Sequence, residues 1–316
     1  MPIDPQVKAH YETKRSATSS GTDTGLSGIA ALRAGSDAIY NDRKKWPPVA
    51  KTEDLSIPCF WGDLPVRVYS PGESGPYPVL IYFHGGGFIL HNIASHDSLC
   101  RALTNETGAV VLNVGYRLAP EAKWPAWLED GYAALEWVRD NAVRIGADPS
   151  RIALAGDSAG AMIAASVALL ARDRRGPKVS LQILAYGASC GLSEAESESY
   201  RTLIDNNYVL NRAFFELARE CNPNVKHESD DNPYRNPGRA KDLSGLPKTF
   251  SLNAEYDPLR DDGEEYARRL AAAGNDVLSW RVPGMMHGFL LLYDKFDTAA
   301  FAVKEIGRVF RETFAE

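Results

Sequence analysis

Short β-type runs alternate with longer helical runs along most of this 316-residue chain, and no other feature restricts its fold as much. Strands that are joined through helices lie parallel, and the helices cover both faces of their sheet. We therefore predict an α/β fold with a mostly parallel central sheet flanked by helices. The predicted strands are residues 56–61, 66–69, 79–83, 109–114, 151–155, 181–185, 249–253 and 277–282. The predicted helices are residues 95–106, 126–145, 159–172, 211–220, 261–273 and 298–313.

Two parts of the chain interrupt this alternation. Residues 1–50 are polar, with Ser, Thr and Gly concentrated at 16–28 and only weak helical patterning at 28–40. Residues 188–245 carry alternating glutamates, one short helical run and a stretch rich in Pro, Asn and Asp. We expect the first part to have little hydrophobic core of its own, and the second to be an insertion.

The net charge of the chain and the length of its apolar runs indicate whether it binds nucleic acid or membranes. The chain has a net charge of −6 and is 44% hydrophobic. A general nucleic-acid binder and a protein held on anionic lipid both need basic clusters, so we expect no nucleic acid and no membrane as partners. The N-terminus has no apolar signal region, and the longest apolar helical stretch, residues 159–171, is too short to span a bilayer. We expect a cytoplasmic protein.

The cysteines are spaced neither for metal binding nor for a redox motif. No two form a CxxC pair, and no Cys and His residues have the spacing of a zinc site. We expect free, mostly buried thiols, as in a reducing compartment, and no metal. The four are Cys59, Cys100, Cys190 and Cys221.

The pentapeptide Gly-Asp-Ser-Ala-Gly at 156–160 stands between a predicted strand and a predicted helix. Such a sharp turn holds its central residue in a strained conformation, and small neighbours such as Gly156 and Gly160 let the backbones pass each other. The hydroxyl of Ser158 then projects above the sheet, where the free N–H groups of the helix N-terminus stabilise a negative oxygen. The turn indicates a nucleophilic serine; the alternative is a turn that serves packing alone.

A second motif, His-Gly-Gly-Gly at 84–87, follows the predicted strand 79–83. Glycine loses more backbone entropy on folding than any other residue, so three in a row suit a loop whose N–H groups approach a ligand closely. In hydrolases with a strand–Ser–helix turn, this loop and the residue after the nucleophile donate N–H groups to the oxyanion. We predict the donors Gly85, Gly86 and Ala159. A dinucleotide loop does not fit, because its third glycine would fall at position 90, which is leucine.

A hydroxyl nucleophile needs a general base, and in this architecture an acid and then a histidine follow the serine. Only His227 and His287 follow it in this chain. His227 lies in a polar run, whereas His287 comes just after the predicted strand 277–282 and so shares the serine's edge of a parallel sheet. We predict His287 as the base.

The acid must lie between the serine and the base, after another strand end. Asp257 follows the predicted strand 249–253 and is our choice, with Glu255 and Asp261 as alternatives. We expect Asp261 instead to cap the following helix. The acid holds the imidazole tautomer and stabilises the imidazolium without taking the proton.

Five motifs, in this order, make the chain resemble the hormone-sensitive-lipase-like branch of the α/β-hydrolases, the bacterial family IV carboxylesterases. They are HGGGF at 84–88, YRLAPE at 116–121, GDSAG at 156–160, DPLRD at 257–261 and HGF at 287–289. The resemblance implies an α/β-hydrolase fold with a small helical cap. It also implies hydrolysis of short- to medium-chain acyl esters of small molecules, without a cofactor.

The resemblance assigns site residues by position. Ser158, Asp257 and His287 correspond to the catalytic triad. The supporting motif residues are His84, Gly87, Gly156, Asp157 and Gly160. Separately from the resemblance, we predict that Phe88, His91 and Tyr186 line the substrate pocket.

The resemblance also implies domain boundaries. A cap formed by residues 1–50 and by the insertion 188–225 covers a catalytic domain of residues 51–187 and 226–316. Dimers through the last strand and last helix occur in the family, which leaves a homodimer open.

The chain departs from the family pattern where His91 and Ala161 replace common glycines. We interpret Ala161 as a helix-favouring change. His91 has two interpretations, an exposed loop histidine or a residue at the pocket mouth that alters substrate preference. Arg117 and Glu121, within YRLAPE, are predicted to join a strand end to the next helix.

Other functions use the same residues. An amidase, lactonase or deacetylase would share the triad, because leaving-group preference depends on pocket shape. A lipase for long-chain fats is disfavoured by the lack of an exposed apolar helix in residues 1–50. A ligand receptor on this fold, like the gibberellin receptors that resemble these esterases, lacks the catalytic histidine, which is present here as His287.

Overall fold

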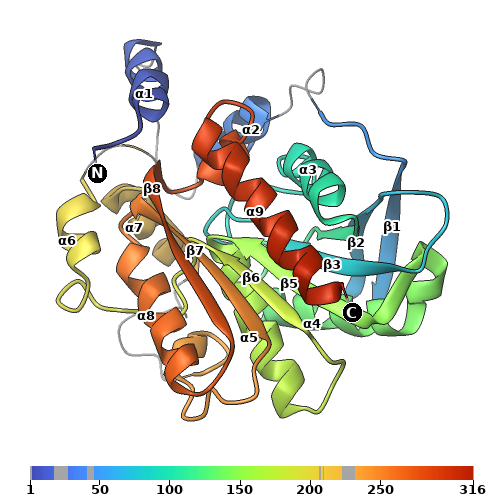
Figure 1. Ribbon diagram of the computed structural model, residues 1–316. Helices are drawn as coiled ribbons and strands as arrows, with labels where there is room; N and C mark the ends of the chain where they lie inside the picture. Colours follow the sequence, from blue (N-terminus) through green and yellow to red (C-terminus); the bar gives the residue numbers. More distant parts are fainter. Residues whose placement is uncertain are drawn as a thin grey trace.

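The computed structural model describes residues 2–17, 28–40, 46–205, 208, 210–222 and 232–315. One eight-stranded sheet crosses its centre in the order β1-β2-β4-β3-β5-β6-β7-β8 (Figure 1). The β1–β2 and β2–β4 pairs are antiparallel, and all the other neighbouring pairs are parallel. The prediction of an α/β fold with a mostly parallel sheet is therefore confirmed.

The strands agree with the sequence prediction except at their ends. Several extend beyond the predicted runs, and the longer carboxyl ends of β7 and β8 carry these strands directly up to Asp257 and His287. The strands are β1 (Lys51–Cys59), β2 (Gly62–Ser70), β3 (Tyr77–Phe83), β4 (Val110–Val114), β5 (Ala147–Asp157), β6 (Leu181–Ala185), β7 (Lys248–Tyr256) and β8 (Val277–Met286).

Helices cover both faces of the sheet (Figure 1). On one face lie α3 (Asp97–Thr107) and α9 (Asp297–Phe314), which pack against each other. On the other lie α4 (Ala126–Asn141), α5 (Ala159–Asp173) and α8 (Arg260–Ala272). The predicted helix 126–145 is divided into α4 and a 3-10 turn, η3 (Ala142–Ile145); two further turns are η4 (Pro237–Arg239) and η5 (Phe289–Leu292).

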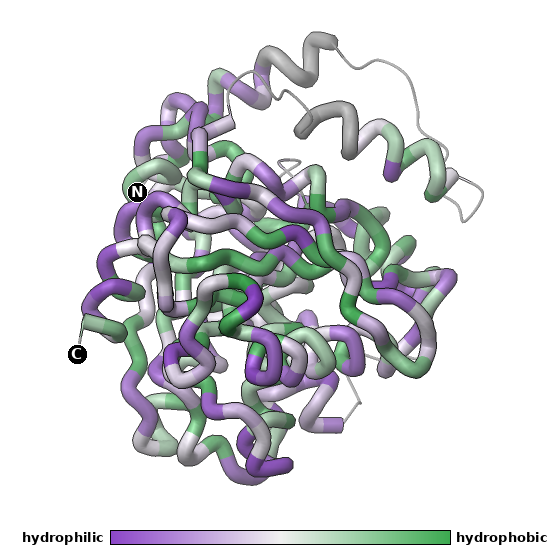
Figure 2. Tube along the Cα trace, turned by 90° about the vertical axis from the view of Figure 1, so that its right-hand side faces the viewer, coloured by the Kyte–Doolittle hydropathy of each residue, from purple (hydrophilic) through white to green (hydrophobic). Residues whose placement is uncertain are grey.

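The side chains of β3 alternate between two hydrophobic cores, one on each face of the sheet. Val79, Ile81 and Phe83 point to the core beneath α4 and α5, whereas Leu80 and Tyr82 point to the core beneath α3 and α9. All five are almost completely buried, as a strand in the middle of a covered parallel sheet requires. Figure 2 shows these hydrophobic segments running through the inside of the molecule.

The N-terminal segment contains helices that the sequence analysis underestimated. The helix α1 (Pro5–Ala17) was not predicted, and α2 (Ile29–Tyr40) was seen only as weak patterning. Val7 is fully buried beside Ile3 and Tyr11, so α1 adds to the core beneath α9. The helix α1 therefore packs on the core beneath α9 and not on a core of its own. Residues 18–27 and 41–45 lie outside the described residues.

Two residues of the YRLAPE motif make different connections. Arg117 donates from Nε to Asp130 Oδ1 of α4 at 3.0 Å, so it joins the end of β4 to the next helix, as predicted. Glu121 does not take part in that connection. Its carboxylate accepts two hydrogen bonds from Arg33 of α2, at 2.7 and 2.9 Å, and so ties the N-terminal segment to the sheet domain.

Two helices lie within residues 188–225, the predicted α7 (Arg212–Cys221) and the unpredicted α6 (Glu198–Leu203). Both begin with a side-chain cap that matches the sequence preference of helix N-termini: Ser197 accepts from the N–H of Tyr200, and Asn211 from that of Phe214. Residues 223–231, which include His227, lie outside the described residues.

The packing of α5 against β3 depends on a glycine. A Cβ atom built on Gly160 would lie 1.9 Å from the carbonyl oxygen of Phe83, far inside van der Waals contact. Neither backbone can move away, because Phe83 ends a central strand and Gly160 belongs to the first turn of α5. The absence of a side chain therefore sets the distance between helix and sheet.

We expect Gly160→Ala to lower the free energy of unfolding by about 3 kcal/mol, because overpacking a core costs energy of this order. Denaturation with urea measures it. The matched control is Gly35→Ala in α2, where a Cβ meets nothing within 4 Å, so stability should stay equal or rise with helix propensity. Equal stability of the two variants would show that the contact is not restrictive.

Candidate active site

Ser158 occupies the turn between β5 and α5 with φ 52° and ψ −120°. A positive φ is unusual for a residue with a side chain and marks backbone strain. Gly156 permits this turn, because a Cβ there would lie 2.3 Å from the carbonyl of Gly160. The N–H of Ser158 donates to the carbonyl of Ala185 at 2.8 Å, which fixes the turn to the end of β6. The sequence predicted a strained turn at this place.

Three side chains from three strand ends meet at this turn. Nε2 of His287 lies 2.9 Å from Oγ of Ser158, and Nδ1 of His287 lies 2.7 Å from Oδ2 of Asp257. Asp257 directly follows β7, and His287 directly follows β8. The parallel sheet thus brings together the three residues that the sequence analysis selected.

The imidazole and its carboxylate partner are held from several sides. Asp257 is fully buried, and its Oδ1 accepts the N–H of Leu259 at 2.9 Å. The ring of Tyr186 packs edge-on against His287, with 4.9 Å between ring centroids. Tyr186 is buried and does not line the cavity described below, so its assignment to the substrate pocket is wrong. It contacts the imidazole from behind.

The two alternative acids serve other contacts. Glu255 accepts the N–H of Gly284 at 2.7 Å. Asp261 does not cap α8, which begins at Arg260 with no side-chain cap; its Oδ2 instead accepts the N–H of Ser199 at 2.7 Å. This contact joins α8 to α6 in the insertion.

Asp262, the next residue, makes a similar connection. Its two carboxylate oxygens accept the N–H groups of Cys190 and Leu192, each at 2.7 Å. Burial raises the pKa of Asp262 to about 6, although these backbone hydrogen bonds oppose the shift. The start of α8 therefore holds the beginning of the insertion through two neighbouring carboxylates.

The glycine loop differs from the prediction at one of the proposed donors. The N–H of Gly85 donates to Asp157 Oδ1 at 2.9 Å and is not available to a substrate, so its assignment to the oxyanion site is wrong. The N–H groups of Gly86, Gly87 and Ala159 have no acceptor among the described residues. Gly86 and Gly87 adopt φ values of 113° and 63°, which glycine tolerates and other residues rarely do.

Asp157 links the nucleophile turn to the glycine loop. Its carboxylate is 2% exposed, and Oδ1 accepts hydrogen bonds from Tyr82 Oη at 2.8 Å, the N–H of Gly85 at 2.9 Å and His96 Nε2 at 3.1 Å. Burial alone would raise the pKa of this carboxyl. The attraction of His96 and the hydrogen bonds outweigh burial and lower the pKa to about 2. A buried negative charge is thus stabilised next to Ser158.

Two other histidines shape the glycine loop from behind. His84 stacks on Tyr116, with ring centroids 4.2 Å apart, and its Nδ1 lies 2.8 Å from the carbonyl of Gly85. His91 packs edge-on against His96 and bonds Ser36 of α2 at 3.2 Å. Burial lowers the pKa values of His84 and His91 to about 3. His91 is therefore neither an exposed loop residue nor part of the pocket lining, and both interpretations are wrong.

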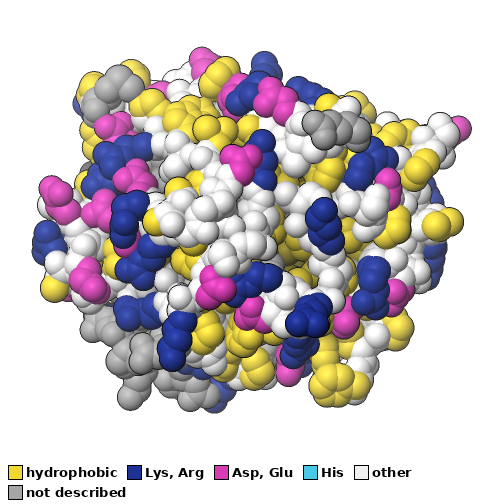
Figure 3. Space-filling view, turned by 60° about the horizontal axis from the view of Figure 1, so that its bottom comes forward, with side chains coloured by type: hydrophobic (Ala, Val, Ile, Leu, Met, Phe, Trp, Pro, Cys, Tyr) yellow, Lys and Arg dark blue, Asp and Glu magenta, His cyan; other side chains and the backbone are white. Residues whose placement is uncertain are grey.

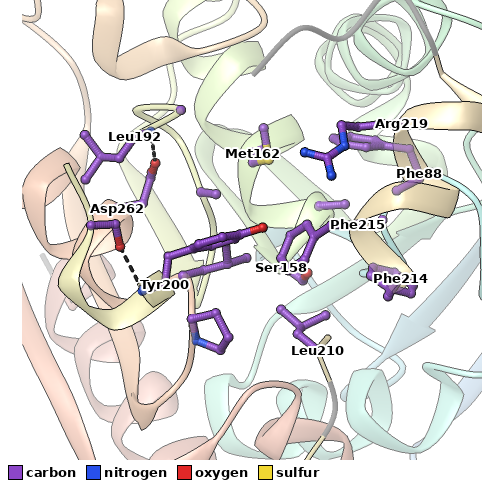
Figure 4. A pocket seen from close by; sticks show the side chains of 18 of the residues that line it. Phe88, Ser158, Met162, Leu192, Tyr200, Leu210, Phe214, Phe215, Arg219 and Asp262 are labelled. Atoms are coloured by element: carbon purple, nitrogen blue, oxygen red, sulfur yellow. Dashed lines mark hydrogen bonds between the residues drawn. The ribbon is translucent and has the colours of Figure 1, made fainter. Parts of the chain in front are cut away.

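A cavity of about 120 Å³ opens beside Ser158 (Figure 4). Its walls are mostly apolar, and many of the lining residues lie between positions 188 and 222. Of the predicted pocket residues only Phe88 lines it, stacked on Trp127. Lining residues are Gly87, Phe88, Ser158, Ala159, Met162, Ala188, Gly191, Leu192, Glu194, Ser197, Tyr200, Leu210, Phe214, Phe215, Ala218, Arg219, Asn222, Pro258, Leu259 and Asp262.

The sequence analysis missed the contribution of α7 to this cavity. Phe214, Phe215, Ala218 and Arg219 line it, together with Asn222 at the helix end. Their spacing of three and four residues is that of one helix face, and this pattern was the signal available in the sequence. The pattern does not say which surface the face will cover.

The four cysteines are free, with three buried and Cys59 half-buried, as predicted. Across the described ranges, no three His, Cys, Asp or Glu side chains are grouped so as to hold a metal ion. None of the helices in these ranges combines the length and apolar character needed to cross a membrane.

Comparison with known proteins agrees with this geometry. A model of the family described as alpha/beta hydrolase fold matches residues 80–291, which is more than half of the chain. The chain belongs to this family. The match confirms the predicted fold class and, with the relatives below, the resemblance to hormone-sensitive-lipase-like carboxylesterases.

Similar proteins include a carboxylesterase, NlhH, of Mycobacterium tuberculosis, 43% identical over 232 residues that cover 72% of each chain. An arylesterase of Saccharolobus solfataricus is 35% identical over 294 residues, which cover 92% of this chain and 93% of that one. Among solved structures, the hyperthermophilic esterase of the archaeon Pyrobaculum calidifontis superimposes with a TM-score of 0.90 at 34% identity, over the whole of both chains.

The lowered pKa of Asp157 makes stability depend on pH in a predictable direction. A carboxyl whose pKa falls from 3.8 to about 2 on folding stabilises the protein above pH 3.8, and this contribution disappears as the pH falls through 2. We expect Asp157→Asn to lower the free energy of unfolding by about 2 kcal/mol at pH 7. The loss should shrink as the pH falls from 4 towards 2. Urea denaturation across pH measures it.

Asp140→Asn on the exposed surface of α4 is the control, because it removes the same charge without breaking a buried network. It should leave stability nearly unchanged. If Asp157→Asn lowers the free energy of unfolding by the same amount at every pH, Asp157 contributes through its shape and not through its charge.

Proposed function

We propose that the chain hydrolyses carboxylic esters by transferring the acyl group first to Ser158 and then to water. The chain is a carboxylic ester hydrolase, as are the carboxylesterase and arylesterase to which it is similar. The observation that carries the serine mechanism is the continuous hydrogen-bonded series Ser158–His287–Asp257 at the wall of the cavity, with distances of 2.9 and 2.7 Å. This is the arrangement that activates a hydroxyl for attack.

In the first half of the reaction, Oγ of Ser158 attacks the ester carbonyl carbon and its proton passes to Nε2 of His287. Asp257 stabilises the imidazolium and keeps its Nδ1 proton directed to the carboxylate. The bond between the carbonyl carbon and the alcohol oxygen then breaks. The proton on His287 goes to that oxygen, and an acyl-serine remains.

In the second half, a water molecule attacks the acyl carbon while His287 accepts its proton. The bond to Oγ breaks, the proton returns to Ser158, and the carboxylic acid leaves. Both halves pass through a tetrahedral oxyanion, for which the donors are the N–H groups of Gly86, Gly87 and Ala159. These groups are free, and preorganised donors of this kind contribute about 10²–10³-fold each to the rate.

Short- to medium-chain acyl groups fit the cavity best. An engineered apolar cavity of about 150 Å³ holds one benzene molecule, and the cavity here measures about 120 Å³. Phe215, Leu210 and Met162 supply apolar walls next to Ser158 (Figure 4). A chain of a few carbons therefore replaces water favourably, whereas a long fatty chain meets side chains of α7.

The same cavity supports a division into two parts, a catalytic domain of residues 51–187 and 226–316 and a cap of residues 1–50 and 188–225. One support is that α6 and α7 supply Tyr200, Phe214 and Phe215 to the cavity wall. Another is that Arg33 of α2 donates a hydrogen bond to the carbonyl of Ile89, next to the glycine loop.

The cytoplasmic location and the homodimer stay predictions from the sequence. β8 is the last strand of the sheet, and its residue Leu278 is exposed, which supports the proposal of a dimer.

Ser158→Ala removes the nucleophile and should reduce release of p-nitrophenol from p-nitrophenyl butyrate by about 10⁴-fold or more. A fluorophosphonate should label the unaltered chain at Ser158 and leave the variant unlabelled. Thermal denaturation serves as the control, since the loss of one hydroxyl should not unfold the protein. Turnover that survives in Ser158→Ala would overturn the mechanism.

Phe215→Ala should move chain-length preference upward, because it removes a wall of the cavity. We expect the ratio of kcat/KM for p-nitrophenyl octanoate over butyrate to rise about tenfold, the order that a few methylenes can supply. Phe60→Ala, at the tip of the β1–β2 hairpin and 91% exposed, is the matched control and should not change the ratio. An unchanged ratio in Phe215→Ala would mean that the acyl chain lies elsewhere.

A further inference from the structure

One charged side chain in the cavity wall has no partner. Arg219 extends from α7, and Figure 4 shows its guanidinium reaching inward beside Phe88 towards Met162. Within the described part of the chain, it makes no ion pair and no hydrogen bond. Other arginines among the described residues are paired, for example Arg33 with Glu121 and Arg212 with Glu194. Arg219 is an exposed residue, so its guanidinium at the cavity wall is open to a negatively charged group of a ligand.

The other charges of the cavity wall are already compensated. Glu194 accepts from Arg212 at 3.2 Å. Asp262 accepts the N–H groups of Cys190 and Leu192, and it lies across the cavity from Arg219 in Figure 4. Arg219 is thus the one uncompensated charge among the described residues of this lining. The end of the cavity formed by α7 is positive, although the whole chain carries a net charge of −6.

A second polar group without a partner lies on the same helix face. Asn222 lines the cavity three residues after Arg219, is 3% exposed, and its Oδ1 has no hydrogen-bond partner in the described structure. A buried side-chain amide that lacks a partner costs free energy unless a ligand satisfies it. Because the two ends of an Asn amide are interchangeable by rotation, this group can also present its NH₂ to an acceptor.

We propose that Arg219 and Asn222 form a subsite for a carboxylate group carried by the substrate. The preferred substrates are then monoesters with a free carboxylate, such as the half-esters of aliphatic dicarboxylic acids. This inference rests on the proposed function, since it concerns the ester that Ser158 cleaves. An arginine pairs with a carboxylate through two parallel hydrogen bonds, and such charge-assisted bonds are among the strongest in proteins.

The side chains around the proposed subsite suggest that the substrate carboxylate is recognised by direct contacts within the cavity. On the face drawn in Figure 3, basic and acidic side chains are interspersed. The apolar walls from Phe88, Phe215 and Met162 keep the methylene chain of such a substrate out of water. Discrimination against the neutral ester of equal length therefore depends on the guanidinium of Arg219 and the amide of Asn222.

The test compares two matched series in a pH-stat at pH 7.5. One series is monoethyl succinate, glutarate and adipate; the other is ethyl butyrate, valerate and hexanoate, with the same acyl lengths and no carboxylate. In Arg219→Gln, kcat/KM for the best monoethyl diacid should fall about tenfold, mainly through KM. The neutral ester of equal length should change less than about twofold, and Arg219→Lys should keep most of the preference.

Lys304→Gln, on the exposed surface of α9, removes the same charge far from the lining and should leave both series unchanged. Asn222→Ala should lower the preference about threefold. Added NaCl should reduce the preference of the unaltered chain but not that of Arg219→Gln.

The inference is overturned if Arg219→Gln affects both series equally, because the preference ratio is then unchanged and Arg219 is a merely structural side chain. An unchanged ratio in Asn222→Ala would remove the amide from the subsite and so overturn the two-residue form. Failure of the proposed function gives a different result, because Ser158→Ala would then still cleave both series. If Ser158→Ala is inactive on both and Arg219→Gln leaves the ratio unchanged, only the carboxylate subsite is wrong.

Discussion

The parallel register of β5, β7 and β8 is the constraint on which the whole site depends. Ser158 and His287 are 129 positions apart in the chain, yet they lie within hydrogen-bond distance because their strands end at the same edge of one sheet. The pairing of β7 with β8 places Asp257 beside His287 in the same way. A shift of β8 by one residue would turn its side chains to the opposite face, so the register and the contact are inseparable.

A buried polar network sets the positions of the groups around this contact. The carboxylate of Asp157 collects donors from β3, from the glycine loop and from His96, so strand, loop and nucleophile turn form one unit. A fully satisfied network inside a protein is rigid, because each broken bond would leave an unpaired buried group. The N–H groups that face the cavity therefore need little rearrangement when charge develops on a substrate oxygen.

The sequence was sufficient for the sheet, for the strained serine and for the two residues that reach it, because hydrophobic periodicity and chain order determine strand ends. The sequence was insufficient where a contact between groups far apart in the chain decides the orientation or the hydrogen-bond partner of a residue. Nothing in the order of the glycines shows that Asp157 takes the N–H of Gly85, or that Tyr186 turns behind His287. The orientation of α7 was equally hidden, since an inserted helix can turn its apolar face to several surfaces. By contrast, α1 could have been found from Ile3, Val7 and Tyr11, spaced four residues apart in a polar segment.

The neighbouring carboxylates of Asp261 and Asp262 have a consequence for how proteins of this type diversify. They fasten both Ser199 and the backbone at 190–192 to the first turn of α8, only a few residues after Asp257. Residues 190–192 and Ser199 are thereby fixed to α8, whereas α7 takes no part in these contacts. Mutations in α7 can remodel which molecules enter without disturbing the acid that serves the reaction. Natural variation and laboratory selection can therefore change the residues of α7 while Ser158, His287 and Asp257 stay the same.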